Sequence, residues 1–361
     1  MDKYSARSLL RPQNVGFAFL LVAIFAVQAC LAADHPAGQS AAIGKPATKP
    51  ISLDLLQAAA ERGAPADQHA LADCYFRAMG APRNLSLAYE WYRKAGQQGH
   101  PDGQYKVFVC LNLGLGVKAD RFEAREWLIK AAGQNHPRAQ HSLGILHEFG
   151  EAGIQRDVDA AVRYYRRGVE LGDPDSFRAL ATCYHNGTGV PKDMVRAVEL
   201  YRQAADKGHQ VAQVILATLH LEGVSLPRDP ERAFQLARAA AERGLTRGQF
   251  MIGTLYYGGT GVPRNPEQAV LWYQKAAIAG DHKAMYNLGY CKVMGEGCPR
   301  DVVEAYALWT LASAGLPEAK ESLRKLTLRL SAQEEAAAKQ RAEVIHALVR
   351  TGREDAMLLG Y

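Results

Sequence analysis

The chain has 361 residues, of which 22% are charged and 48% hydrophobic, and this composition excludes an intrinsically disordered protein. A mean hydropathy of −0.21 excludes a protein that crosses a membrane many times. The 43 basic and 37 acidic residues leave a net charge of +6 without any run of lysine or arginine, so nucleic acid is not an expected partner. Six cysteines in a chain of this length exclude a disulfide-rich mini-scaffold.

The first 33 residues have the pattern of a targeting segment. An uncharged run at 15–27, too short to span a bilayer comfortably, follows three basic residues and precedes small residues at Ala32 and Ala33. The sequence from Val27 to Cys30 resembles a bacterial lipobox, with an unusual glutamine at its second position. Three alternatives therefore remain open: a secretory signal that is cleaved, a lipoprotein acylated at Cys30, and an uncleaved anchor. Residues 34–50, rich in alanine, glycine and proline, are expected to form a flexible linker.

Residues 51–318 repeat with a period of 35 to 37 residues. One recurring position holds glycine, with Asn135 in one copy: Gly63, Gly99, Gly172, Gly208, Gly244, Gly280 and Gly315. A second position holds asparagine or aspartate: Asn84, Asp120, Asp157, Asp193, Asp229, Asn265 and Asp301. Four residues later alanine recurs: Ala88, Ala124, Ala161, Ala197, Ala233, Ala269 and Ala305. A fourth position holds mostly small residues: Ala72, Phe108, Gly144, Ala181, Ala217, Gly253 and Gly289.

Each recurring residue has a physical interpretation. An Asn or Asp side chain can accept hydrogen bonds from the free N–H groups at the start of a helix. The alanine one turn later suits a point where two helices approach closely, and the glycine suits the left-handed residue that ends a helix. Each copy is therefore predicted to be two antiparallel helices, joined by a loop such as Gly187 to Pro191. One such pair cannot bury its own apolar face, so the copies must stack.

The most regular copy carries a specific resemblance. From Ile252-Gly253, through Gly259-Thr-Gly261-Val262 and Trp272-Tyr273, to Gly280, it resembles the Sel-one-like repeat (SLR) family, a relative of the tetratricopeptide repeats. The resemblance covers about residues 52–318 and implies an all-α, right-handed α-solenoid of stacked antiparallel helix pairs, with about seven 36-residue repeats. Phe108, Asn135 and a loop at Gly80 that is interpreted as lacking its second glycine depart from the pattern. The capping box Ser331-x-x-Glu334 predicts a C-terminal capping helix within 319–361.

The residues with reactive or metal-binding side chains have structural interpretations. Four cysteines occupy one repeat position and are expected in the core. Cys298 lies seven residues from Cys291, so a disulfide between these two is kept as an alternative. No zinc-binding spacing occurs, and no metal or cofactor is expected. The recurring glycine is followed, directly or after one residue, by His100, His209 and His282. We interpret these histidines as turn residues with a structural role.

Ser322 and Lys325 match the Ser-x-x-Lys motif of penicillin-recognising enzymes. The downstream Lys-Thr-Gly motif is missing, and a chance match is the favoured interpretation. The motif matters because the resemblance includes secreted relatives that were assigned penicillin-binding or β-lactamase activity. Enzymatic activity of that type is therefore kept as an alternative, and no catalytic residue is predicted.

A binding face is the favoured functional feature. Positions −6, −3, +1 and +4 from the small residue form a stripe on each first helix, and the resemblance implies that this stripe lines a concave groove. The stripe includes His69, Asp73, Phe76, Tyr105, Val109, Asn112, Arg138, His141, Glu148, Arg178, Thr182, His185, Val214 and Thr218. In the last two copies it includes Phe250, Thr254, Tyr257, Lys283, Tyr286 and Tyr290, where four aromatic side chains could grip a peptide or pack between repeats.

The predicted function is an exported, non-enzymatic scaffold or adaptor of the bacterial envelope. The expected partner is a protein or peptide bound in the groove, without nucleic acid or small-molecule cofactor, and with a membrane tether only if the N-terminus is retained. The expected location is periplasmic or secreted. The alternatives are an enzyme of the type described above and a passive structural component of the envelope.

Overall fold

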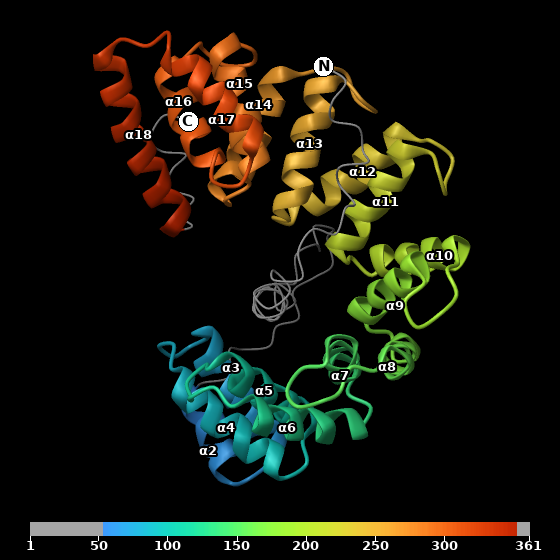
Figure 1. Ribbon diagram of the computed structural model, residues 1–361. Coiled ribbons are helices and arrows are strands. Elements are labelled where there is room, and N and C mark those ends of the chain that lie inside the picture. Colours follow the sequence, from blue (N-terminus) through green and yellow to red (C-terminus); the bar gives the residue numbers. More distant parts are fainter. Residues whose placement is uncertain (1–52, 352–361) are drawn as a thin grey trace, which may run out of the picture. The chain divides into compact units, whose positions relative to one another are not determined.

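The computed structural model describes residues 53–351, and every regular element in that range is a helix (Figure 1). The predicted signal segment, the linker, Cys30 and residues 352–361 of the predicted cap lie outside the described residues. The half repeat that opens the array is α2 (Leu53–Glu61). The first helices of the seven repeats are α3 (Pro65–Arg77), α5 (Pro101–Leu113), α7 (Pro137–Phe149), α9 (Pro174–Asn186), α11 (Gln210–Glu222), α13 (Thr246–Gly258) and α15 (His282–Met294). The second helices are α4 (Leu85–Gln97), α6 (Arg121–Gly133), α8 (Val158–Glu170), α10 (Met194–Asp206), α12 (Pro230–Glu242), α14 (Pro266–Ile278) and α16 (Val302–Ala312). The cap consists of α17 (Pro317–Thr327) and α18 (Ala332–Thr351).

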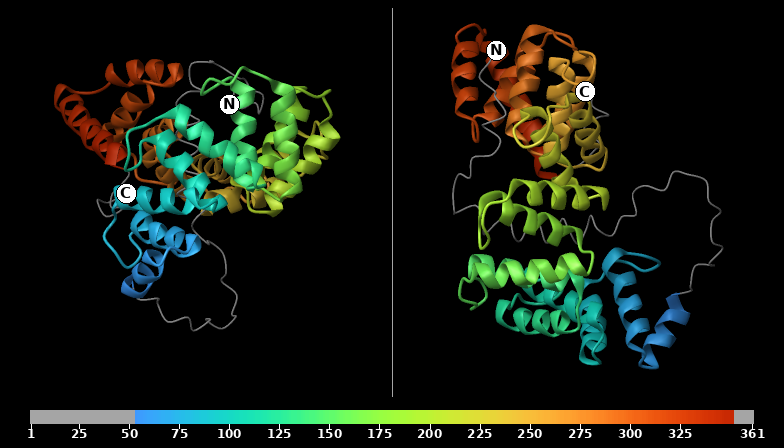
Figure 2. Two further views of the ribbon diagram at one scale, coloured as in Figure 1. Left: turned by 90° about the horizontal axis from the view of Figure 1, so that it is seen from below. Right: turned by 90° about the vertical axis from the view of Figure 1, so that its right-hand side faces the viewer.

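The described chain divides into two compact units, at residues 53–203 and 204–351. In the first unit, successive helices from α2 to α9 pack against one another, and α3 also touches α5, as α7 touches α9. The two further views show the antiparallel pairs of this unit from other directions (Figure 2). The second unit repeats the arrangement from α11 to α16, with α13 against α11. The predicted all-α solenoid of stacked helix pairs is thereby confirmed.

The helix starts follow the Asn/Asp pattern. All seven side chains at this position accept a hydrogen bond from the backbone N–H three residues later, at 2.8 to 3.0 Å. The alanines four residues beyond the caps are at most 1% exposed. Both predictions are confirmed, and each cap contributes about 1 kcal/mol to the stability of its helix.

In several repeats the small residue of the first helix faces a large ring of the following second helix. A Cβ atom added to Gly144 would lie 2.3 Å from the ring of Tyr165, and one added to Gly289 would lie 2.5 Å from the ring of Trp309. The second repeat exchanges the two sizes, because Phe108 stands at the small position and Leu128 at the ring position of the same buried cluster. In this copy the larger residue on the first helix compensates for the smaller one on the second helix, whereas the fifth copy has alanine at both positions, Ala217 and Ala237.

The glycines after the second helices adopt positive φ angles, from 81° at Gly172 to 101° at Gly63, and Asn135 takes the same role with φ 60°. Gly315 is the exception and corrects the prediction, since its φ is not in the left-handed region. A Cβ atom at Gly315 would instead lie 2.1 Å from Nδ1 of His282, so close approach explains the glycine there.

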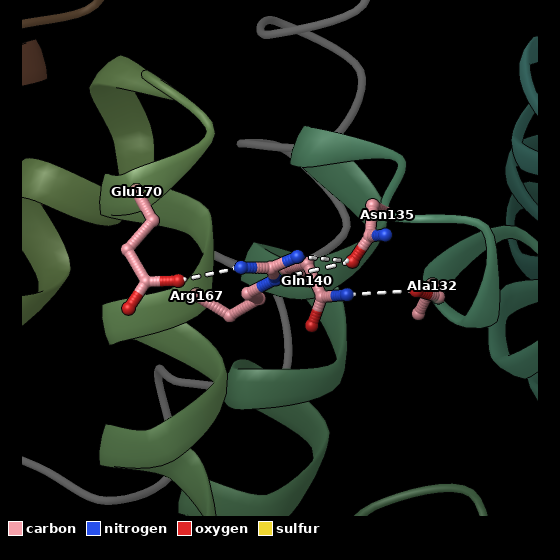
Figure 3. Close-up of polar contacts among 5 residues, drawn as sticks. All are labelled: Ala132, Asn135, Gln140, Arg167 and Glu170. Atoms are coloured by element: carbon pink, nitrogen blue, oxygen red, sulfur yellow. Dashed lines mark hydrogen bonds and ion pairs between the residues drawn. The ribbon is translucent and has the colours of Figure 1, made fainter.

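Asn135 also connects two repeats through its side chain (Figure 3). Its Oδ1 accepts from Nε and Nη2 of Arg167 on α8, at 3.1 and 2.9 Å. Arg167 in turn donates to Glu170 at 2.7 Å. In the same view, Nε2 of Gln140 on α7 donates to the carbonyl oxygen of Ala132 at 2.7 Å. A glycine at residue 135 would supply the backbone conformation but none of the contacts to α8.

The first interhelical loop was interpreted wrongly from the sequence. The left-handed residue that ends α3 is Ala78, with φ 58°, and Gly80 stands at the second glycine position with φ 76°. The loop therefore lacks the first glycine of the pattern, not the second. In later repeats the second glycine is required by close approach: a Cβ atom at Gly116 would lie 2.1 Å from the carbonyl oxygen of Leu85, at the start of the previous second helix.

The C-terminal cap begins α18 with the predicted capping box. The backbone N–H of Ser331 donates to Glu334 Oε2 at 2.8 Å, and the N–H of Glu334 donates to Ser331 Oγ at 3.3 Å. Ala338, Ala342 and Ile345 are buried, and α18 packs against α14 and α16. Within residues 53–351, no helix combines the length and apolar character needed to cross a membrane.

Candidate functional site

The first unit contains a polar pocket of about 430 Å³ on the first helices of its repeats. It lies between α3, α5 and the starts of α7 and α9. Four stripe residues line it, one or two from each of three successive repeats: His69, Asp73, Tyr105 and Arg138. The remaining lining residues are Arg77, Asp102, Lys106, His136, Pro137, Leu171, Gly172, Asp173 and Pro174. We call this the first-unit pocket.

The three carboxylates of the first-unit pocket are engaged by the protein itself. Asp73 accepts from the hydroxyl of the buried Tyr92 and lies 3.6 Å from Nη2 of Arg77. Asp102 contacts Nε2 of His136 at 3.2 Å. Asp173 is 4% exposed, and its Oδ2 accepts from N–H and Oγ of Ser176 at the start of α9.

The pocket cations differ in their surroundings. Arg77 faces Asp73 in the same helix, one turn earlier. Lys106 is 7% exposed, with its ammonium 5.5 Å from the centre of the Phe76 ring. Arg138 is the second residue of α7 and is half-buried. The pocket therefore places three cations beside three carboxylates, and its formal charge is balanced when its histidines are neutral.

His136 fixes the geometry of one wall. Its Nδ1 accepts from the backbone N–H of Ala139 at 3.1 Å and so caps α7, and its ring stacks on Tyr105 with centroids 4.6 Å apart. Because Nδ1 accepts, the proton of the neutral ring is on Nε2, which donates to Asp102. This hydrogen bond is the main cause that lowers the pKa of Asp102 to about 2, so the carboxylate is ionised throughout the physiological range.

His69 is the second imidazole of the pocket. It stacks on His100, with ring centroids 5.1 Å apart, and lies 5.4 Å from the ring of Tyr92. Burial lowers its pKa, and the nearby Asp73 opposes this effect only in part. The ring is therefore neutral at neutral pH.

The other predicted residues of the first unit lie beside buried tyrosines. His141 is tilted against Tyr165, with centroids 5.8 Å apart, and His185 lies edge-on to Tyr201 at 6.2 Å. Burial lowers the pKa of His185. Arg178 is half-buried on α9, where its carbonyl oxygen accepts from Thr182. None of these three predicted binding residues lines the first-unit pocket.

The structure gives each aromatic side chain predicted in the second unit an intramolecular contact. Tyr257 donates to Glu296 at 2.6 Å, and Tyr286 meets Ser322 at 3.3 Å while stacking on Trp309. Phe250 and Tyr290 are partly buried and pack against the core. These are packing contacts within and between repeats, and the role of these residues in partner binding stays a prediction.

The two polar residues predicted in the second unit differ in their contacts. Thr254 is exposed, donates to the carbonyl oxygen of Phe250 at 3.0 Å and accepts from Tyr273 at 3.4 Å. Lys283 is half-buried on α15. Thr254 therefore provides a hydrogen-bond acceptor for the hydroxyl of the buried Tyr273.

The sequence motifs with chemical alternatives also have locations. Lys325 pairs with Glu321 at 3.2 Å, and Ser322 contacts Tyr286, so the described contacts of the two motif residues are with other side chains. The five described cysteines are free thiols, which means that the Cys291–Cys298 disulfide is not formed. Burial raises the pKa of Cys291 to about 12, as expected of a core residue. Within residues 53–351 no cluster of side chains is suited to a metal ion.

Sequence reasoning missed most of the pocket's charged residues. His136, Asp102, Lys106 and Asp173 were not singled out, because they lie at helix starts or one residue off the stripe. A signal existed for His136 and Asp173, which stand one residue after the terminal Gly/Asn position, where His100, His209 and Asp281 also stand. All five cap the following helix.

Comparison with known proteins agrees with this geometry. The Sel1 repeat profile matches residues 65–100, 101–136, 137–173, 178–209, 210–245, 246–281 and 282–315. The chain is similar to c5321, a protective antigen of uropathogenic Escherichia coli with an SLR fold, at 28% identity and a TM-score of 0.70 over 86% of this chain and 67% of that one. It is also similar to a Sel1 repeat protein from Oxalobacter formigenes, at 29% identity and a TM-score of 0.59 over 76% of this chain and 80% of that one.

A search of curated proteins found no significant match. The profile matches nevertheless cover well over half of the chain, in seven copies that coincide with the helix pairs. Repeats of this kind commonly build scaffolds for protein–protein interaction. The chain belongs to the Sel1 repeat family.

Proposed function

We propose that this protein is a non-catalytic scaffold that binds a segment of a protein partner through the first-unit pocket. The observation that carries the proposal is the continuity of the pocket across repeats. Its lining comes from α3, α5, α7 and the start of α9, so a bound chain that crosses the repeats would meet side chains from each of them. A stacked repeat array offers such an extended surface because each repeat presents the same face.

The chemistry of the lining supports a peptide-like ligand. The stacked rings of Tyr105 and His136 form an aromatic part of the lining, and three cations and three carboxylates belong to the same lining. Tyrosine gives contact area at a small cost in conformational entropy, which suits it to binding surfaces. The aromatic stripe of the second unit, around Tyr257 and Tyr286, is kept as a second contact region within the same proposal.

We also propose that the chain is exported and works in the bacterial envelope. The basic start, the short apolar run and the small residues before Ala33 support this part of the proposal. Acylation of Cys30 would add a membrane tether. Mass spectrometry of the mature protein would distinguish an acylated Cys30 from an N-terminus produced by cleavage near Ala33.

A non-catalytic role is supported by the contacts of the Ser-x-x-Lys motif. The ammonium of Lys325 is held by Glu321, 3.2 Å away on the exposed surface of α17. Nitrocefin should therefore not be turned over, and a fluorescent penicillin should not label Ser322. Either reaction, abolished by Ser322→Ala, would contradict the proposal.

The direct test is a crosslinked pull-down from the native envelope. The pocket variant combines Asp102→Ala with Arg138→Ala, and the control combines Asp159→Ala with Arg163→Ala on the exposed side of α8, with the same change in charge. We expect a partner that the unchanged protein and the control capture and the pocket variant loses, at equal thermal stability.

A third variant addresses the second unit, with Tyr257, Tyr286 and Tyr290 all changed to alanine. If the pocket variant captures the same proteins as the unchanged chain, the proposed site is wrong. Loss of the partner in the aromatic variant alone would move the binding face to the second unit.

A further inference from the structure

We propose that the first-unit pocket receives an acidic side chain of the bound protein segment, and that Arg138 is its main partner. This inference rests on the proposed function and names the chemistry of the ligand. It starts from an imbalance in the pocket: its carboxylates are engaged, whereas one of its cations is not.

The carboxylates offer little to an incoming cation. Asp173 is buried and bonded to the start of α9, and Asp73 is bonded to Tyr92 and faces Arg77. Asp102 is the most exposed of the three, at 59%, and it holds the Nε2 proton of His136. A ligand ammonium would have to compete with these bonds at each carboxylate.

Arg138 is in the opposite situation. Among residues 53–351 its guanidinium has no ion-pair or hydrogen-bond partner, although it is half-buried and lines the pocket. A guanidinium presents five N–H donors in a planar fork that matches a carboxylate. Partial burial strengthens the attraction by lowering the effective dielectric constant around the pair.

One further feature favours an anion at this point. Arg138 is also the second residue of α7, where the helix dipole places partial positive charge. The acidic group is assigned to a protein segment because the pocket opens along successive repeats and includes the Tyr105 face, which a free carboxylate ion would leave uncovered.

The test compares three synthetic heptapeptides, acetylated and amidated at their ends. Each consists of serine and alanine around a central glutamate, glutamine or lysine. Binding to the full chain is followed by chemical-shift changes of labelled protein at 50 mM and 500 mM salt. We expect the glutamate peptide to bind about tenfold more tightly than the glutamine peptide at low salt, and the difference to shrink at high salt because the ion pair is screened.

Variants connect the preference to the residue. Arg138→Gln should abolish it, Arg138→Lys should keep part of it, and Arg163→Gln, an exposed substitution on α8 outside the pocket, should leave it unchanged. Equal binding of the glutamate and glutamine peptides, a preference for lysine, or an unchanged preference in Arg138→Gln would overturn the inference. Free glutamate that competes at the peptide's own concentration would overturn the assignment to a protein segment.

The two proposals can fail separately. If the pull-down partner is lost in the pocket variant but no peptide shows a charge preference, the binding site stands and the acidic ligand is wrong. If no partner depends on the pocket, the proposed function itself is wrong, whatever the peptides do.

Discussion

Single residues in this protein are constrained mainly by the atoms that face them across a repeat. Two helix glycines of the first unit illustrate this, because they have opposite surroundings. Gly144 lies against the ring of Tyr165, whereas a Cβ atom added to Gly133, at the end of α6, would meet nothing within 4 Å. The residue type is the same, but only one of the two is needed for packing.

This contrast gives a prediction at the scale of one methyl group. Gly144→Ala should lower the free energy of unfolding by about 1–3 kcal/mol, because the new methyl overlaps the fully buried ring of Tyr165. Gly133→Ala should be neutral or stabilising by up to about 1 kcal/mol, since alanine is the better helix former. Urea denaturation of the two variants measures both values, and equal midpoints would mean that the Tyr165 ring moves aside freely.

Elements in this chain begin with side-chain caps at both helices of the repeat. The second helices use the Asn/Asp position, and several first helices use the residue after the terminal glycine. Histidine fills that position three times, with Nδ1 of His100, His136 and His209 accepting a backbone N–H at 3.1 to 3.2 Å. Aspartate fills it at Asp173 and Asp281, at 2.8 Å. The repeat thus shows that either side chain can start this helix.

The cap at α11 can be tested with the repeat's own alternative. His209→Ala should reduce the stability of the second unit by about 1 kcal/mol, and His209→Asp should retain it. Thermal unfolding of the three proteins at pH 7.5 measures both effects. An alanine variant as stable as the unchanged protein at pH 7.5 would show that the cap contributes nothing.

A second link between elements was not recognised in the sequence. Gln68, Gln104, Gln140 and Gln213 each donate through Nε2 to the carbonyl oxygen eight residues earlier, at the end of the preceding second helix. These carbonyls lie at a helix terminus, where they lack partners within their own helix. The glutamines were missed because a polar residue near a helix start has no distinctive hydrophobic pattern, and its partner is known only when the turn is built.

At the scale of the whole molecule, the described histidines whose pKa is lowered by partial burial lie in the first unit. Burial lowers the pKa of His69, His147 and His185 below the ordinary histidine value of 6.5. The folded state therefore favours the neutral rings, while the unfolded state takes up protons near pH 6.5. Their stabilising contribution is complete above that pH and is lost as the pH falls from about 6.5 towards the lowered folded-state values.

We therefore expect the thermal midpoint of the protein to fall between pH 7.5 and pH 5. A variant with His69, His147 and His185 changed to glutamine should show a smaller fall, because glutamine does not titrate. Scanning calorimetry over this range gives both curves, and identical pH dependence in the two proteins would show that other groups cause the acid sensitivity. The lowered pKa of Asp102, about 2, acts in a separate window below about pH 4 and should not affect this measurement.

The sequence by itself determined the period, the family resemblance and the pairing of helices. It could do so because those features are fixed by local chemistry that recurs in every copy: a cap accepts N–H groups three residues away, and a left-handed residue ends a helix wherever it stands. The same reasoning correctly placed Asn135 among the glycines. It failed at Gly315, where the close approach of His282 explains the glycine. It also failed in the Gly80 loop, where Ala78 takes the left-handed conformation that the pattern gives to glycine.

Only the tertiary structure decided which residues share a site. The first-unit pocket joins His69, Asp102, His136 and Asp173 from helices that are about one repeat apart in the sequence. The recurring cap position marks His136 and Asp173, and the stripe marks His69, but neither pattern shows that these residues lie together with Asp102. The sequence likewise left open whether Tyr257 packs against the protein or binds a partner. Its hydrogen bond to Glu296 joins residues 39 positions apart, which the sequence pattern does not reveal. Local interactions fix the repeat, whereas a site arises from the differences between neighbouring copies that stacking brings together.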